Sequence, residues 1–289
     1  MMKNKEIIVV VGPTASGKSD FAVELAQKVN GEIISADSRQ IYKELDIGTG
    51  KITKKEMKGV QHYMLDVSNV DDTFSVSEYK NLAEPILKDI LSRGKIPIIC
   101  GGTGQYIDAL IFDTSIPHVA PNKKLRDTLE KKTTEELHEL LLKKDSRRAK
   151  EIDPHNRVRI IRALEITESL GKVPLQEKAE LRYQTKIYLL SPTRELLRER
   201  ITERLLKRLK VGMIDEIKNI LKKGYTSDEM KKFGLEYVTI AKYLEGKITE
   251  EEMQKEIITK SMQYAKRQET WNKKYLATYK NITIVVPVE

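Results

Sequence analysis

One stretch near the N-terminus constrains this chain most, because three features follow one another there without a gap. Residues 7–11 are apolar and mostly β-branched, which predicts a strand buried on both faces. Gly12–Ser19 matches the pattern G-x-x-x-x-G-K-S, and Asp20–Val29 has the periodicity of a helix. A strand, this loop and a helix in that order predict a phosphate-binding loop at a helix N-terminus.

The loop predicts both the ligand and the groups that bind it. We expect the backbone N–H groups of residues 14–19 to point into the loop, Lys18 to face the outermost phosphate and Ser19 to bind Mg²⁺. The candidate residues for binding a diphosphate or a nucleotide are Gly12, Pro13, Thr14, Ala15, Ser16, Gly17, Lys18 and Ser19. A glycine turn without a ligand is the alternative.

Positive charge is unevenly distributed along the chain. The sequence has 289 residues and a formal net charge of +9. Residues 117–185 carry 16 Lys or Arg against 12 Asp or Glu, and residues 186–215 carry 8 against 4. A phosphate site beside a basic surface favours a polyanionic second partner. A solvated helical surface rich in Lys and Glu is the alternative.

The remaining composition excludes several classes of protein. Cys100 is the only cysteine, which leaves no internal disulfide and no zinc cluster, and its place at the end of an apolar run predicts a buried thiol. No apolar run reaches the length of a membrane span, and the N-terminus leads into a strand rather than a signal peptide. We therefore expect a cytoplasmic protein with no membrane partner.

Two further predicted strands end in residues that can carry chemistry. These strands are 32–37 and 95–100, and the second is followed by the glycine-rich segment 101–104. Because ligands bind at the carboxyl ends of parallel strands, Asp37 and Thr103 should lie close to the phosphate loop. The other predicted core elements are strands at 62–67, 186–190 and 282–286, and helices at 75–93, 105–111, from 191 onward, 212–221, 240–244 and 249–275. Together they predict an α/β fold: a P-loop NTPase- or kinase-like core with a parallel sheet.

A helical block interrupts this core. The proline-bearing segment 115–121 connects to residues 122–182, whose pattern predicts helices that begin at Pro121-Asn122, Thr133 and Asp153-Pro154. We therefore divide the chain into a first core part (1–116), an inserted helical domain (117–185) and a second core part (186–289).

Arg200, Arg204 and Arg208 form a positive stripe at four-residue spacing on the helix that follows residue 191. The stripe either faces a ligand or is a solvated face paired with Glu199 and Glu203.

A phosphate loop alone is compatible with a motor or switch NTPase, a small-molecule kinase or a transferase that uses a diphosphate. The long apolar strand at 96–100 ends in glycines instead of an acidic residue, which disfavours an NTPase. Asp37 can hold Mg²⁺ or accept a proton from an incoming nucleophile. Its alternative role is to cap the next helix through Ser38.

The order of six sequence segments along the chain is also informative. The region that they cover extends from residue 7 to about residue 275. They are Gly12–Ser19, Ile34–Tyr42, Asp46–Lys51, Gly101–Tyr106, Arg159–Glu165 and Ala265–Trp271. Together these segments resemble the signature motifs of the tRNA dimethylallyltransferase family. The Asp-Ser-x-Gln-x-Tyr and Gly-Gly-Thr pieces separate this family from kinases with a similar loop.

The resemblance implies transfer of a dimethylallyl group from dimethylallyl diphosphate to the exocyclic N6 amine of the adenosine 3′-adjacent to the anticodon of a tRNA. It implies that residues 14–19 cradle the diphosphate with Mg²⁺ on Ser19, that Asp37 is the general base, and that Thr103 donates to a bridging or leaving oxygen. The insertion then binds the anticodon stem-loop, and the target base flips into the core. Positions that match tRNA contacts in the family are Asp37, Ser38, Arg39, Gln40, Thr103, Arg126, Val158, Arg159, Ile160, Ile161 and Arg162. We expect a monomer.

Two departures from the family pattern concern RNA binding. Asn272 and Lys273 stand where members often have Phe-Arg, and segment 233–237 replaces the common Ile-Gly-Tyr. Two alternatives also stay open. A small-metabolite kinase would close Arg200 and Arg204 over phosphate, and a nucleotide-sensing protein would bind tRNA without forming a covalent product.

Overall fold

The computed structural model describes residues 5–113, 117, 119–175, 180–278 and 282–286. The chain forms two compact units, which we call the core unit (residues 1–113 and 180–289) and the helical unit (residues 114–179). The predicted insertion ended at residue 185, but Gln184 already pairs with Glu6 in the sheet, so the last residues of that range belong to the core unit. The predicted connector at 115–121 lies partly outside the described residues.

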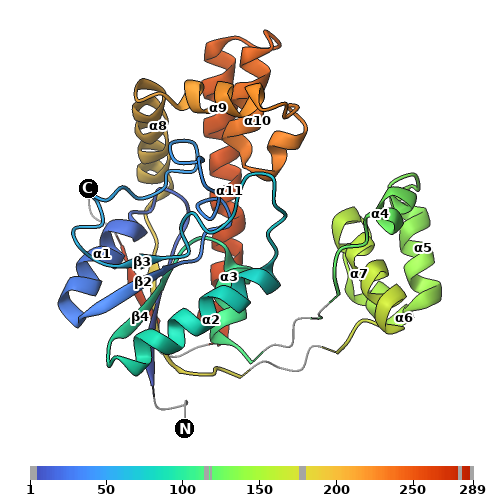
Figure 1. Ribbon diagram of the computed structural model, residues 1–289, viewed down its shortest axis with the longest axis horizontal. Coiled ribbons are helices and arrows are strands. Elements are labelled where there is room, and N and C mark those ends of the chain that lie inside the picture. Colours follow the sequence, from blue (N-terminus) through green and yellow to red (C-terminus); the bar gives the residue numbers. More distant parts are fainter. Residues whose placement is uncertain (1–4, 114–116, 118, 176–179, 279–281, 287–289) are drawn as a thin grey trace. The chain divides into compact units, whose positions relative to one another are not determined.

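In the described part of the core unit, six strands form one parallel sheet in the order β3-β2-β4-β1-β5-β6 (Figure 1). The strands are β1 (Glu6–Val11), β2 (Gly31–Ser35), β3 (His62–Tyr63), β4 (Ile96–Cys100), β5 (Gln184–Leu190) and β6 (Ile282–Val285). The predicted α/β fold with a parallel sheet is confirmed. β3 is shorter than the predicted strand 62–67, because Met64 and Asp66 have φ angles of 63° and 56° and leave the extended conformation.

Helices cover both faces of this sheet, which explains the unbroken apolar sequence of β1. Ile8 and Val10 pack with residues of α1 (Lys18–Val29) on one face. On the other face lie α2 (Val76–Ser92) and α3 (Gly104–Ile111), as Figure 1 shows. Tyr79 of α2 donates its hydroxyl proton to Ser35 O at 2.9 Å. The prediction of a strand buried on both faces is thus confirmed, since Ile7–Val11 are all buried.

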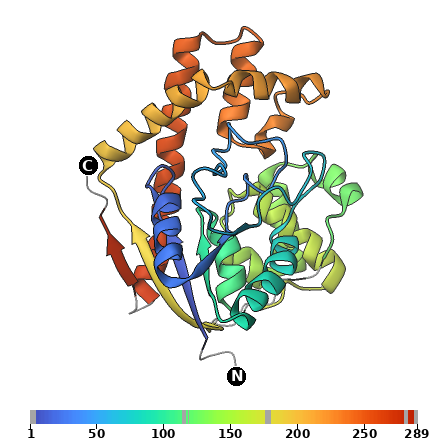
Figure 2. The same ribbon diagram turned by 60° about the vertical axis from the view of Figure 1, so that its left-hand side comes forward.

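The remaining elements among the described residues of the core unit are helical. They are α8 (Arg194–Lys210), α9 (Met213–Lys222), the short 3₁₀ helix η1 (Glu229–Lys232), α10 (Leu235–Leu244) and α11 (Glu250–Thr278). α11 is the longest of these and packs against α3, α8 and α10. Figure 2 shows it extending from the level of the sheet to α9 and α10. Because α8 and α11 pack together, they bring residues from the last third of the chain to the N-terminal loop.

The described helical unit consists of α4 (Lys123–Leu129), α5 (Thr134–Lys144), α6 (Ser146–Glu151) and α7 (Arg157–Leu170). Asn122 and Thr133 cap the helices predicted to begin there. The predicted start at Asp153-Pro154 is wrong. Asp153 accepts a hydrogen bond from His155 N in a turn, and Asn156 is the residue that caps α7.

Among the described residues, none of the helices combines the length and the apolar composition that crossing a lipid bilayer requires.

Candidate active site

The phosphate loop lies where the sequence predicted it, between β1 and α1. Gly17 has a left-handed backbone with φ of 85° and directly precedes α1, a conformation that glycine adopts without the strain of a Cβ atom. β1 is a central strand that pairs with β4 on one side and β5 on the other. The loop is therefore at the carboxyl edge of the sheet, where α/β folds bind ligands.

The amides of the loop do not all face a ligand. Thr14 N–H donates to Gln268 Oε1 at 2.7 Å, and Ser16 N–H donates to Pro13 O at 3.2 Å. The expectation that every amide of residues 14–19 points into the loop is wrong for these two, because a neighbouring helix and a local turn use them. Ala15 packs beside the apolar cluster of α8 and α11. Of the amides predicted to bind phosphate, those of residues 15 and 17–19 remain.

The ammonium group of Lys18 binds the backbone of the phosphate loop itself. Its Nζ donates to Pro13 O at 2.9 Å, and burial lowers the pKa of this lysine. Cys100 lies beside it, with Sγ 3.6 Å from Lys18 O, and burial raises the pKa of this thiol to about 12. The prediction of a buried thiol is confirmed, and a thiol with so high a pKa is not a nucleophile near neutral pH.

Ser19 is exposed in the first turn of α1, directly after the loop. Among the described residues, no group of three or more His, Cys, Asp or Glu could hold a metal ion. The donors present suit an ion of the Mg²⁺ type, which keeps several waters and binds substrate phosphates together with one or two protein oxygens.

The ends of β2 and β4 are joined by a short network of hydrogen bonds. Thr103 N donates to Ala36 O at 3.0 Å, and Thr103 Oγ1 accepts from Ser38 N at 3.0 Å. Thr103 Oγ1 also lies 3.2 Å from Ser38 Oγ and donates to it. The two segments approach so closely that an added Cβ at Gly101 would lie 2.1 Å from Ala36 O. This glycine is therefore required for the contact that holds Thr103 beside Asp37.

Asp37 lies partly buried at the carboxyl end of β2, in the turn that this network holds. Its Oδ1 accepts from Arg39 N at 2.8 Å, which fixes the carboxylate within a local turn. The alternative role as a helix cap is wrong, because residues 38–41 form a turn and not a helix. The charge of Asp37 raises the pKa of Lys18, Arg204 and Arg208, which shows that these cations lie near it, although burial lowers all three pKa values more strongly.

Two arginines of the stripe on α8 contact the phosphate loop, and the third contacts the loop at 46–50. Arg204 Nη2 donates to Thr14 Oγ1 at 2.7 Å, Arg200 Nη1 lies 3.5 Å from Ser16 O, and Arg208 Nη1 lies 3.4 Å from Gly48 O. Burial lowers the pKa of Arg204 to about 10 and also lowers that of Arg208. The solvated-face interpretation is wrong, since the side chain of Arg208 is only 12 % exposed.

A second loop is anchored beside this stripe. Glu216 of α9 accepts hydrogen bonds from the backbone N–H groups of Asp46, Ile47 and Gly48 at 2.7–2.9 Å, and from Tyr237 Oη at 2.6 Å. An added Cβ at Gly48 would lie 2.6 Å from the Tyr237 ring, so the loop rests on it. Segment 233–237, one of the two departures, thus forms the support of this loop.

Two of the predicted tRNA contacts near Asp37 already have partners within the core unit. Gln40 Nε2 donates to Gly50 O at 3.1 Å, and Arg39 Nη1 donates to Lys232 O. These bonds hold residues 39 and 40 against the loop at 46–50 and against η1. The backbone N–H group of Ser38 donates to Thr103 Oγ1.

In the helical unit, two of the predicted contacts share one buried carboxylate. Glu165 has no exposed side-chain surface, and both of its oxygens bind the guanidinium of Arg126 at 2.7 Å. Arg162 Nη1 lies 3.2 Å from Glu165 Oε2, and its Nη2 donates to Val119 O at 2.7 Å. Burial raises the pKa of Glu165, but bonds from Arg126, Asn122 N and Arg162 outweigh this and leave the pKa lowered.

The segment 158–162 divides into an exposed and a buried part. Val158 is 78 % exposed, and Arg159 is also exposed on the first turn of α7. Ile160 and Ile161 are 0 % and 5 % exposed and pack in the core of the helical unit, so the predicted tRNA contact by these two side chains is wrong. Helical periodicity separates the two pairs, since adjacent residues face different directions.

Two residues with a clear place in the site are not predicted from the sequence. Gln268 was part of a quoted motif but had no chemical role, and Glu216 had no motif at all. Neither can be found from local pattern, because Thr14 and Gln268 are 254 positions apart. Asn272, the other departure, is buried on α11, and its Nδ2 has no hydrogen-bond partner among the described residues.

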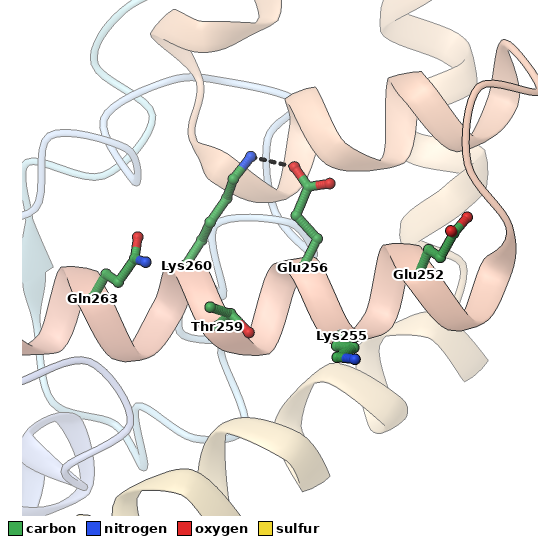
Figure 3. Close-up of a pocket in the computed structure, with 6 residues that line it drawn as sticks. All are labelled: Glu252, Lys255, Glu256, Thr259, Lys260 and Gln263. Carbon is green, nitrogen blue, oxygen red and sulfur yellow. Dashed lines mark hydrogen bonds and ion pairs between the residues drawn. The ribbon is translucent and has the colours of Figure 1, made fainter.

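An open depression of about 330 Å³ lies on one face of α11 (Figure 3). Its lining is Glu252, Lys255, Glu256, Thr259, Lys260 and Gln263. Glu256 is paired with Lys242 and Lys260. None of the phosphate-loop residues contributes to it.

A comparison with family models identifies one match: the model described as IPP transferase matches residues 40–275. The tRNA dimethylallyltransferase of Thermoanaerobacter sp. (strain X514) is 42 % identical over 282 residues, which cover 93 % of this chain and 89 % of that protein.

Two solved structures are similar over nearly the whole chain. The full-length tRNA isopentenylpyrophosphate transferase from Bacillus halodurans has a TM-score of 0.71 and 34 % identity, covering 98 % of this chain and 90 % of its own. A eukaryotic dimethylallyltransferase acting on tRNA has a TM-score of 0.86 and 28 % identity, covering 98 % of this chain and 74 % of its own.

Proposed function

This chain belongs to the IPP transferase family, and we propose that it transfers a dimethylallyl group from dimethylallyl diphosphate to the N6 amine of the adenosine 3′-adjacent to a tRNA anticodon. The chain is a prenyltransferase that acts on tRNA, like its curated relatives. One observation supports the finer assignment most. Asp37 and Thr103 lie beside a phosphate loop that Arg204 covers, so a base and an anion site share one location.

The leaving group explains why buried cations surround the loop. Breaking the allylic C–O bond places negative charge on the departing diphosphate, and preorganised cations and amides stabilise that charge. Burial lowers the pKa values of Lys18 and Arg204, because removing these cations from water disfavours their charged forms. A bound diphosphate supplies a counter-charge, so these residues bind it and hold the leaving oxygen.

We assign Ser19 as the protein ligand of Mg²⁺, bound together with the diphosphate. Bound there, such an ion would supply positive charge to the phosphate oxygens of the leaving group.

Asp37 is assigned as the general base that removes the proton of the adenine amine while the C–N bond forms. The Arg39 N–H group holds Oδ1 and thereby orients the carboxylate. Thr103 is assigned as a donor to the bridging or leaving oxygen. Its hydroxyl proton is donated to Ser38 Oγ in this structure. This hydrogen bond must therefore break before the hydroxyl can donate to the substrate.

The RNA is proposed to bind through Arg126, Val158, Arg159 and Arg162 of the helical unit and through residues 37–40 of the core unit. Arginines bind backbone phosphates, which positions an RNA without reading its sequence. We further propose that the protein acts as a monomer in the cytoplasm.

A transfer assay tests the proposal. The protein, Mg²⁺ and unmodified tRNA are incubated with labelled dimethylallyl diphosphate, and the RNA is digested to nucleosides. We expect label in a dimethylallyl-adenosine and its loss when the adenosine next to the anticodon is replaced. A parallel reaction contains ATP labelled at its terminal phosphate. ATP consumption without prenyl transfer would contradict the proposal and favour a small-metabolite kinase, whereas tRNA binding without any product would favour a nucleotide-sensing RNA-binding protein.

A further inference from the structure

Gln268 joins the two glycine-rich loops of the site. It lies on α11 and is 7 % exposed. Its Oε1 accepts from Thr14 N at 2.7 Å, and its Nε2 donates to Gly102 O at 3.1 Å. We propose that Gln268 is a positioning residue for the transfer reaction: it fixes the separation between the loop that holds the diphosphate and the loop that holds Thr103. This inference rests on the proposed function.

The chemistry of the site accounts for a glutamine at this position. The two partners are a backbone donor and a backbone acceptor, and a primary amide is the side chain that serves both at once. Glutamate would lose the donor, and an aliphatic side chain would lose both bonds. The Thr14 amide would then be a donor without this partner in a partly buried place, which is costly.

Gly102 also lies close to the amide of Gln268. An added Cβ at Gly102 would lie 2.0 Å from Gln268 Nε2 and 3.3 Å from its Cδ. The next atom is Lys18 Cε at 3.9 Å, an ordinary contact distance. A side chain at position 102 would therefore displace Gln268 and little else.

Gln268 connects the segment that binds the leaving group with the segment next to the base. On one side is Thr14, whose hydroxyl accepts from Arg204 Nη2. On the other side is Gly102, followed by Thr103, which binds Ser38 next to Asp37. The Gln268 side chain thus adds to the pairing of β1 with β4 in setting the separation between the leaving oxygens and the base. An error of about 1 Å in such a separation can reduce a rate about 100-fold.

The test is a double-mutant cycle of Gln268→Ala and Gly102→Ala in the full-length protein, with kcat and both KM values measured in the transfer assay. We expect each single variant to lower kcat about 10- to 100-fold with an unchanged KM for tRNA. The double variant should be no slower than Gln268→Ala, because the clash at position 102 disappears with the glutamine. Gln263→Ala, an exposed glutamine on the same helix, should match the parent (Figure 3).

Three results would overturn the inference. They are a Gln268→Ala variant as fast as the parent, a double variant whose losses multiply, and a kcat loss fully explained by unfolding of the variant at the assay temperature. Thermal unfolding of all variants identifies the last case. A parent protein that transfers no dimethylallyl group would contradict the proposed function itself, and that result is distinct from all three.

Discussion

The core unit and the helical unit both depend on arginines, but they hold them in opposite ways. In the core unit, Arg204 donates to the hydroxyl of Thr14, and burial lowers its pKa to about 10. In the helical unit, Arg126 and Arg162 share the buried carboxylate of Glu165, and the side chains are 42 % and 36 % exposed. The first arrangement leaves positive charge for a small, desolvated anion. The second fixes the orientation of charges that solvent can reach, which suits a large polyanion.

The sharpest test of the core unit removes Asp37, one of the carboxylates near its cations. If Asp37 only balanced their charge, Asp37→Ala would bind diphosphate more tightly and keep its rate. As a general base, it should instead lower kcat about 10²–10⁴-fold while both substrates still bind. Single-turnover rates at saturating substrates measure this. A rate equal to that of the parent would remove Asp37 from the mechanism.

The next test removes the arginine that contacts the phosphate loop. Arg204→Ala should lower kcat/KM for dimethylallyl diphosphate about 10²–10³-fold, since a preorganised donor to a charged transition state is lost. The affinity for tRNA should change little. Arg198→Ala on the same helix is the matched control, because Arg198 is exposed. Equal losses in the two variants would mean that net charge, and not the position of the guanidinium, is what matters.

The contrast between the two units also shows what sequence can predict. Local signals were sufficient for the phosphate loop and for helix starts such as Asn122 and Thr133, because their capping bonds form within one turn. The spacing of the arginine stripe was visible, but its direction was not. That direction depends on the burial of Leu197 and Ile201 against Ala265 of α11, a tertiary contact.

Long-range partners were hidden for the same reason. Gln268 acquires its role only when α11 brings it to Thr14, and Glu216 only when α9 meets the loop at 46–48. In the helical unit, Ile160 and Ile161 matched the motif by position, although packing turns them inward. A motif identifies the segment, whereas the fold decides which of its side chains are available.

The helical unit is tested through its shared carboxylate. Glu165→Gln should destabilise the protein by about 1–3 kcal/mol, toward the low end because solvent screens the partly exposed arginines. The pKa of Glu165 is lowered in the folded state, so its contribution is present above the ordinary carboxyl pKa and is lost as pH falls through the folded-state value. The variant should therefore lose less stability on acidification than the parent in chemical unfolding.

Glu168→Gln provides the control for this change. Glu168 is exposed on the same helix and pairs with Lys144. Its loss should leave both the stability and its acid dependence close to those of the parent. An identical acid dependence in the parent and in Glu165→Gln would contradict the anchoring role of Glu165.

The smallest expected effect belongs to Arg159, the exposed arginine on the first turn of α7. Arg159→Ala should weaken tRNA binding about 2- to 5-fold and reduce the salt slope by about one, because one phosphate contact is lost. Stability and the KM for dimethylallyl diphosphate should stay unchanged. Lys28→Ala, which removes the same charge in the last turn of α1, should not alter the slope. A change in the KM for dimethylallyl diphosphate instead of the tRNA affinity would contradict the contrast between the two units. It would mean that an exposed arginine of the helical unit acts on the diphosphate and not on the RNA.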